Sequence, residues 1–549
     1  MRRCSAAFAR SKVREPHSAL CDTLGQSGGA PPHSTTLARL KAMLVILAFV
    51  LLSHAARAAD PYIVEEIAPP PNVVPECGGI SFLPDGRLVA VFHHGEVYFY
   101  NPATREWKLF AEGLHDPMGV LAISPTEVLV TQRPELTRLT DTNGDGVADR
   151  YEALSDAWGI SGNYHEFACG IVRDATGNLF VPVTNGSSGS VSRYEVRGTF
   201  KPEGYVRTTH FSAVPYRGCV VKIAPDGTLT PVAYGLRQPN GIGLDAQGRI
   251  FVTDNQGDWV GTSKLHQIVP GRFYGHAASL VWRDDFQLGR TVDELDRLRT
   301  EGVVLFPHAI LANSPGQPAF DTSGGKFGPF AGQMFVPEFN IPRLLRVMLE
   351  EVHGELQGAA TPFFDGPPLR AGTHRLAFAP DGSLWVAQSE RKLGWPGGAG
   401  LQRITWNGET PMEVQAMHLT KTGFDLKFTQ PLNPSTSAAD FTARRYYYQY
   451  HQVYGSPQTD VHPVTATDLR RSESNTRLVF TVDTLAPGYI YELTLSGIRS
   501  ATGVPLRNKL LCYTANCLLD GSVAPVPRPA PTGGQHGSGK DKPKGGNVD

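Results

Sequence analysis

One local pattern recurs along the chain and constrains its fold more than any other feature. A short apolar segment opened by glycine leads through a turn into a second segment of the form Gly-x-apolar-x-Val. Each unit predicts a β-hairpin, since Asp-Gly and Gly-Asn turns supply the positive φ that tight hairpins need. The instances lie at 79–89, 119–130, 170–181, 241–252, 332–336 and 381–386. Six irregular repeats over residues 60–408 predict a six-bladed β-propeller.

The pattern changes after residue 408. Apolar and polar residues alternate in 424–428, 478–482 and 491–495, which is typical of half-buried strands. We therefore expect an immunoglobulin-like β-sandwich at 409–517. Residues 518–549 are rich in Pro, Gly, Ser and Lys, and we expect this tail to be disordered because it has little apolar surface to bury. The predicted class is all-β, with one short helix expected at 292–298.

The first 59 residues resemble an export signal. Met43 is a better candidate than Met1 for the first residue of the protein. Basic residues precede an apolar run at 44–52, and Ala56-Arg57-Ala58 offers a cleavage site. Cleavage near Ala58 or Ala59 would deliver the protein to the periplasm or the medium. The run is shorter than the roughly 20 residues of a spanning helix, so no membrane span is expected. A short uncleaved anchor is the alternative.

Charge and cysteine content narrow the function further. The 549-residue chain has a formal net charge of -1, and the leader carries eight basic and two acidic residues, which leaves -1 - (8 - 2) = -7 after cleavage. A mildly acidic protein is not expected to bind nucleic acid. Five cysteines remain beyond the leader, and Cys512 with Cys517 is a candidate disulfide, with Cys169 and Cys219 a weaker one.

The most specific short motif spans residues 141–152 and fits the EF-hand loop pattern. Carboxylate, amide and carbonyl oxygens at this spacing favour Ca²⁺, and a glycine at position six permits the sharp bend. The predicted ligands are Asp141, Asn143, Asp145, Val147, Asp149 and Glu152. Because no amphipathic helices flank it, we expect a calcium-stiffened loop between strands. A metal-free turn held by Asx side chains is the alternative.

Polar residues stand at the predicted starts of three blades, where inner strands face the central channel of a propeller. His165 is a candidate general base, because an unperturbed imidazole titrates near neutrality. Arg237 and Arg375 could stabilise a developing oxyanion. Alternatively, these side chains only satisfy one another and the turn backbones.

Several of these segments carry a family resemblance. Residues 235–241, with Leu-Arg-Gln-Pro-Asn-Gly, and 254–258, with Asp-Asn-Gln-Gly-Asp, look like the arginine blade and following loop of soluble glucose/sorbosone dehydrogenases. His165 stands where that family has its catalytic histidine, and 373–382 is similar to a later arginine-bearing blade. The segments 163–167, 327–330 and 394–395 also resemble the membrane-bound-dehydrogenase-like propellers of planctomycetes and verrucomicrobia. The resemblance covers about residues 77–408.

The resemblance implies a reaction and its cofactors. In that family His165 would take a proton from a sugar or alcohol hydroxyl while hydride passes to pyrroloquinoline quinone (PQQ), and a periplasmic partner would accept the electrons. Arg237 and Arg375 would polarise the quinone oxygens, and Ca²⁺ would bind near Gln256 and Gly257. The implied cofactor-binding residues are Arg237, Asn240, Gln256, Gly257, Arg343, His374 and Arg375. Arg343 would replace a lysine of the family, and the two side chains differ in geometry.

Two other functions remain open from the sequence. One is a non-enzymatic propeller that binds glycan or protein through exposed aromatics, for which the stretch 444–450 is a candidate surface. The other is a calcium-dependent lactonase or esterase, which requires carboxylates and amides around a central metal.

Overall fold

The computed structural model describes residues 60–188, 196–199, 209–390 and 398–528. The predicted signal peptide, the segment 394–395 and the tail beyond residue 528 lie outside the described residues. The described residues beyond Asp60 group into one compact unit. Within the described residues no helix is both long and apolar enough to cross a membrane.

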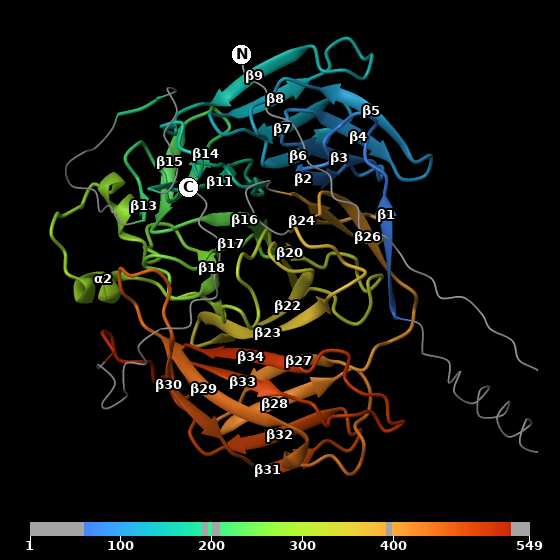
Figure 1. The fold of residues 1–549 in the computed structure, drawn as a ribbon, viewed down its shortest axis with the longest axis vertical. Coiled ribbons are helices and arrows are strands. Elements are labelled where there is room, and N and C mark those ends of the chain that lie inside the picture. Colours follow the sequence, from blue (N-terminus) through green and yellow to red (C-terminus); the bar gives the residue numbers. More distant parts are fainter. Residues whose placement is uncertain (1–59, 189–195, 200–208, 391–397, 529–549) are drawn as a thin grey trace, which may run out of the picture. The chain divides into compact units, whose positions relative to one another are not determined.

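Six four-stranded antiparallel units form the blades of a β-propeller (Figure 1). Blade one contains β2 (Cys77–Phe82), β3 (Leu88–Phe92), β4 (Val97–Asn101) and β5 (Glu106–Ala111). Blade two contains β6 (Gly119–Ser124), β7 (Glu127–Thr131), β8 (Leu136–Thr140) and β9 (Arg150–Ser155). Blade three contains β10 (Val172–Arg173), β11 (Leu179–Val183), β14 (Cys219–Ile223) and β15 (Leu229–Tyr234).

The remaining blades follow the same order. Blade four contains β16 (Pro239–Leu244), β17 (Ile250–Asp254), β18 (Ser263–Ile268) and β19 (Val304–Phe306). Blade five contains β20 (Ala319–Phe320), β21 (Met334–Glu338), β22 (Arg343–Val352) and β23 (Glu355–Asp365). Blade six contains β24 (Thr373–Phe378), β25 (Leu384–Gln388), β26 (Gly400–Trp406) and, from the start of the described chain, β1 (Tyr62–Ile67).

The ring closes through β1, which pairs along its whole length with β26, from Tyr62 opposite Trp406 to Ile67 opposite Leu401. Inner strands of different blades also touch: β2 contacts both β6 and β24, and β16 contacts β10, β20 and β24. β1 thereby supplies the outermost strand of blade six, and the start of the described chain is held in the last blade. The six-bladed propeller predicted from the repeats is therefore confirmed.

Two facing sheets follow the ring. The first has the order β27 (Val414–Leu419), β28 (Gly423–Phe428), β32 (Arg477–Val482) and β31 (Ala466–Arg471). The second has the order β34 (Leu510–Ala515), β33 (Tyr489–Thr494), β29 (Thr442–Tyr448) and β30 (Gln458–Val464). Phe424, Phe480 and Tyr491 pack between them, as expected for a sandwich core. This order matches the A-B-E-D and G-F-C arrangement of immunoglobulin-type sandwiches, and the immunoglobulin-like classification and the domain boundaries stay predictions.

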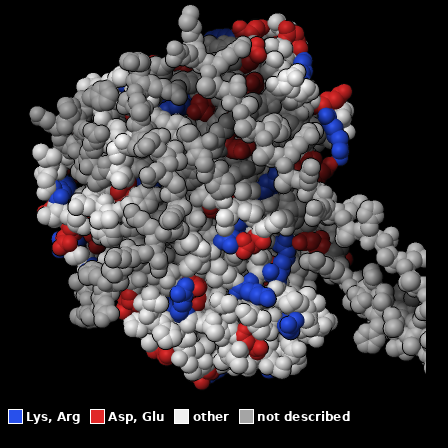
Figure 2. Space-filling view, in the orientation of Figure 1, with Lys and Arg blue, Asp and Glu red and all other residues white. Residues whose placement is uncertain are grey.

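The sandwich is joined to the propeller by a continuous sheet. Strand β23 of blade five pairs with β34 from Gly358 opposite Thr514 to Ala360 opposite Cys512, which gives one eight-stranded sheet. Residues of both parts, such as Val347 and Ile490, share one buried cluster. On the face drawn in Figure 2, basic and acidic side chains are interspersed over the sandwich.

Short elements complete the described structure. The helix α2 (Val292–Leu298) has the predicted bounds, and its capping box joins Thr291 and Glu294. Two 3-10 turns, η1 (Ala277–Trp282) and η2 (Ala438–Asp440), and a ribbon of β12 (Gly186–Ser187) with β13 (His210–Phe211) make up the rest.

The expected disulfides are wrong, because the five described cysteines are buried and none of them forms a disulfide. Cys512 belongs to the cluster shared with the propeller, whereas Cys517 belongs to the sandwich core. Cys169 and Cys219 likewise lie in different clusters. Cys512 lies within β34 and Cys517 follows the end of that strand, so the chain carries the two sulfur atoms into different clusters.

Candidate functional site

A cavity of about 400 Å³ lies at the blade starts. Its lining includes five of the residues expected at a site, which come from four places along the chain: His165, Arg237, Asn240, Gln256 and His374. The lining also includes the imidazoles of His93, His210 and His308, the amides of Asn255, Asn313 and Asn340, and the rings of Phe167, Phe339 and Tyr454. Such a surface combines apolar faces with hydrogen-bonding groups and one guanidinium, which is typical of a small-molecule site.

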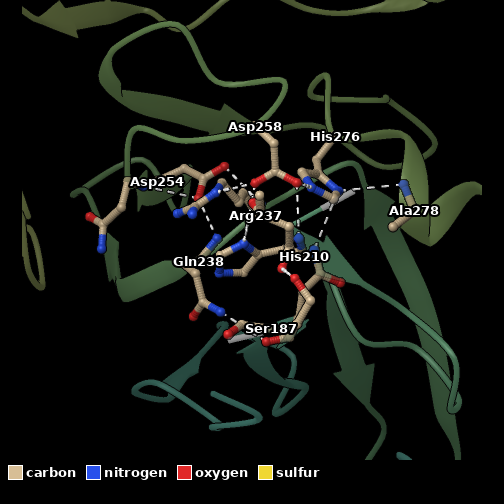
Figure 3. A network of polar contacts seen from close by, with 12 residues as sticks. Ser187, His210, Arg237, Gln238, Asp254, Asp258, His276 and Ala278 are labelled. Atoms are coloured by element: carbon tan, nitrogen blue, oxygen red, sulfur yellow. Dashed lines mark hydrogen bonds and ion pairs between the residues drawn. The ribbon is translucent and has the colours of Figure 1, made fainter. Parts of the chain in front are cut away.

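Arg237 enters the cavity wall through a fixed network (Figure 3). Its Nε donates to Asp258 Oδ1 at 2.8 Å, and its backbone N–H donates to Asp254 Oδ2 at 2.9 Å. Asp258 also accepts the backbone N–H of His210 at 2.9 Å, and its carboxylate contacts the imidazoles of His210 and His276 at 3.2 and 3.3 Å. The guanidinium is therefore already paired with a buried carboxylate.

Burial and pairing set the charges of this network. Burial alone would raise the pKa of Asp258, but hydrogen bonds from His210 and His276 and the charge of Arg237 hold it well below its usual range. Burial lowers the pKa of His210 to about 4, so its imidazole is neutral at pH 7. The cavity wall around Arg237 consequently carries one compensated positive charge.

Arg375 has a different place. Its side chain is fully buried, and its guanidinium donates to the carbonyl oxygens of Gly78, Met118 and Asn240 at 3.0, 3.1 and 2.6 Å. These carbonyls belong to blades one, two and four, whereas Arg375 lies in blade six. It does not belong to the cavity lining. The guanidinium ties four blades together behind the site.

Of three other predicted residues, one lines the cavity and two lie outside its lining. His374 lines the cavity and its Nε2 lies 2.6 Å from the Cys77 carbonyl oxygen. Gly257 lies directly behind Arg237, where any Cβ would overlap the guanidinium. Arg343 is outside the lining. Its guanidinium binds Asp365 at 2.9 Å and the carbonyl oxygens of Ile310 and Leu311.

Sequence reasoning missed three histidines of this lining, His93, His210 and His308, of which His93 has the more informative contacts. His93 follows β3 and lines the cavity. Its Nδ1 lies 2.6 Å from Asp116 Oδ1, while its Nε2 is buried with no hydrogen-bond partner among the described residues. A carboxylate on one ring nitrogen fixes the tautomer and orientation of an imidazole. The pair His93-His94 at the end of a predicted strand was the available signal, but Asp116 is distant in sequence.

The predicted calcium loop lies between β8 and β9, as expected for a loop between strands. None of its residues lines the cavity, and Lys108 Nζ of blade one donates to the Asp145 carbonyl oxygen at 2.7 Å. Asp141 accepts the backbone N–H groups of Gly144 and Gly146, both at 2.7 Å. Glu152 contacts two arginines at 3.4 Å.

Three more predicted ligands of this loop, Asn143, Asp145 and Asp149, also accept backbone N–H groups. Asn143 accepts from the backbone of Asp145 at 2.9 Å, Asp145 from Val147 at 2.8 Å, and Asp149 from Thr142 at 3.2 Å. In the described part of the chain, no three His, Cys, Asp or Glu side chains lie close enough together to hold a metal ion. These hydrogen bonds lie within the loop, and calcium binding and the metal-free alternative both stay predictions.

The charge of the cavity does not fit PQQ, which carries three carboxylates. Of the arginines expected to bind it, only Arg237 belongs to the described lining, and Asp258 already compensates its charge. No lysine belongs to that described lining either. Desolvating three carboxylates beside one compensated cation is unfavourable. The neutral amides of the lining fit an uncharged polar ligand better.

Comparison with known proteins found one matching family model and several similar solved structures. Residues 104–288 match the domain of unknown function DUF7133. No curated protein matches the chain. Solved structures that it resembles include sugar dehydrogenases. A putative oxidoreductase (glucose dehydrogenase) from Thermus thermophilus is 19% identical, with a TM-score of 0.44, and the match covers 62% of this chain and 99% of that one.

Two further structures are similar at the same level. The PQQ-bound aldose sugar dehydrogenase from Streptomyces coelicolor is 15% identical, with a TM-score of 0.42 and coverage of 63% and 98%. Regucalcin, a calcium-binding protein from Agrobacterium tumefaciens, is 13% identical, with a TM-score of 0.37 and coverage of 60% and 90%. Likenesses at this identity concern the fold and leave the chemistry to the site itself.

Proposed function

We propose that this protein binds a sugar or another small alcohol in the cavity and oxidises it, with His165 as the proton acceptor. The observation that carries the proposal is the convergence of His165, Arg237, Asn240, Gln256 and His374 on one cavity. Amide and imidazole groups can both donate and accept hydrogen bonds, which suits the hydroxyls of a neutral polyol.

Oxidation of an alcohol removes the hydroxyl proton and a hydride from the carbon. The part of this chain is to orient the hydroxyl and to receive the proton on an imidazole, a transfer that typically contributes 10²–10⁴-fold to a rate. Arg237, held by Asp258, would stabilise negative charge on the substrate oxygen as the proton leaves. The two electrons of the hydride pass to an external electron acceptor, which in the assay is the dye. The resemblance implies a quinone and Ca²⁺ for this step, and the assay with and without PQQ and Ca²⁺ tests their part.

A binding module without catalysis is the second candidate. The mismatch between the cavity and a cofactor with three carboxylates favours it, because a neutral sugar would bind there without any redox group. A calcium-dependent lactonase or esterase has less support, since no Asp or Glu belongs to the described lining. Export to the periplasm and a periplasmic electron acceptor belong to the proposal as well.

The test is reduction of an artificial electron-accepting dye by the purified protein with a panel of sugars, each with and without added PQQ and Ca²⁺. We expect turnover that His165→Ala lowers at least about 10²-fold. His94→Ala is the control, because His94 follows His93 in the sequence but lies outside the described lining. Loss of activity in His93→Ala but not in His165→Ala would reassign the proton acceptor. Sugar binding without dye reduction under every condition would favour the binding module.

A further inference from the structure

The loop between β29 and β30 belongs to the sandwich by sequence, but it reaches the cavity of the propeller. Tyr454 of this loop lines the cavity. It also forms an isolated β-bridge with Asp258, the carboxylate that holds Arg237. One wall of the cavity is therefore supplied by the second part of the chain.

The loop is fastened to blade four by its backbone. The Gly455 N–H donates to the Gly257 carbonyl oxygen at 2.9 Å, and the Ser456 N–H donates to that of Gly261 at 2.9 Å. The Tyr450 hydroxyl donates to the Gly275 carbonyl oxygen at 2.5 Å. These bonds fix the loop against the propeller, so that Tyr454 is held in place before any ligand arrives.

The ring of Tyr454 combines support on one side with exposure. The Arg237 guanidinium lies 5.1 Å from the ring centroid, and the residue remains 58% exposed. An exposed tyrosine on a rigid loop offers a large amphipathic surface at small entropic cost. Next to the loop lies Gln256, and the adjacent Asn255 has a buried Oδ1 without a hydrogen-bond partner among the described residues.

We propose that Tyr454 is the platform on which the cavity receives the ring of a neutral pyranose, whose hydroxyls bind Asn255 and Gln256. This inference rests on the proposed function only in that it places a sugar in the cavity, and it requires no oxidation. The apolar C–H face of a pyranose covers the aromatic ring, while its edge offers hydroxyls to amides. The sandwich thereby selects ring-shaped sugars over linear polyols.

The test is titration calorimetry of the full protein with methyl β-D-glucopyranoside, methyl α-D-mannopyranoside and, as a linear polyol, sorbitol. We expect Tyr454→Ala to raise the Kd of any pyranoside bound by the wild type about tenfold and to change sorbitol binding less. Tyr454→Phe keeps the ring and should stay within about threefold. Val453→Ala is the matched control, because Val453 is 65% exposed on the same loop and outside the lining.

An unchanged pyranoside Kd in Tyr454→Ala would overturn the inference, as would the absence of pyranoside binding by the wild type. A pyranoside that binds but is not oxidised leaves the platform intact and removes only the dehydrogenase. Turnover of a sugar at an unchanged KM in Tyr454→Ala would support the dehydrogenase and remove the platform.

Discussion

Arg237 and Arg375 lie near the starts of β16 and β24, the first strands of blades four and six, and serve the ring in different ways. Arg237 is paired with one carboxylate and faces the cavity. Arg375 is enclosed and donates to oxygens of other blades and of its own backbone neighbour. An arginine at similar places in two repeats can therefore belong either to the site or to the scaffold. Which one it belongs to depends on the acceptors that surround it.

The largest effect expected from this comparison is on stability. Arg375→Met removes donors that bind carbonyl oxygens from blades one, two and four, and it leaves these buried oxygens without that donor. We expect the free energy of unfolding to fall by about 5 kcal/mol, which is measured by urea denaturation. Arg375→Lys should recover part of the loss. A melting temperature of Arg375→Met equal to that of the wild type would refute the scaffold role.

Arg237→Met should cost less stability, about 3 kcal/mol, because His210 and His276 remain beside Asp258. Sugar affinity, measured by calorimetry, should fall, since the cavity loses its guanidinium and the support of the Tyr454 ring. A greater loss of stability here than in Arg375→Met would reverse the comparison.

His266 of blade four differs from both arginines. It is a buried polar residue for which the described chain supplies neither donor nor acceptor. Both of its ring nitrogens lack a hydrogen-bond partner within that part of the chain, and burial lowers the pKa of this histidine to about 3. Between pH 6.5 and about 3 the unfolded chain binds a proton here that the folded protein does not, so stability falls as the pH drops through this window.

We therefore expect His266→Phe to stabilise the protein by about 2 kcal/mol more at pH 5 than at pH 8. The measurement is urea denaturation of both proteins at the two pH values. An equal effect at pH 5 and pH 8 would contradict the prediction.

The smallest effect is expected at the loop of residues 141–152, which lies away from both arginines. Asp141→Ala removes the acceptor of two backbone N–H groups and should cost about 1 kcal/mol without calcium. Calorimetry with millimolar Ca²⁺ after chelation tests the metal: heat in the wild type and none in Asp141→Ala would support a calcium site. Heat in neither protein would leave only the Asx-turn loop. Sugar binding should be unchanged in the variant.

Much of the fold was predictable because it is local. The glycine-opened hairpins indicated all six blades, and the alternation at 424–428 and 478–482 indicated strands that became β28 and β32. The helix α2 has the bounds that were predicted, and a local Thr-x-x-Glu capping box begins it. In each case the residues that decide the structure are within a few positions of one another.

The site was only partly predictable, because its contacts join distant residues. His165, Arg237 and His374 could be placed at blade starts, but the sequence did not distinguish Arg237 from the enclosed Arg375. Tyr454 carries no motif, and its place in the cavity depends on how the sandwich meets blade four. The pairing of β1 with β26 joins residues more than 300 positions apart and likewise had no local signal.

The pairing of β23 with β34 has a consequence for any shortened form of this protein. β23 is an 11-residue strand with nine buried residues, and β34 bonds to its outer edge at Gly358–Ala360. A chain cut after residue 408 would keep the ring of blades but would lay open an apolar strand edge in blade five, which favours self-association. The sandwich thus also serves the propeller as a solubilising cover.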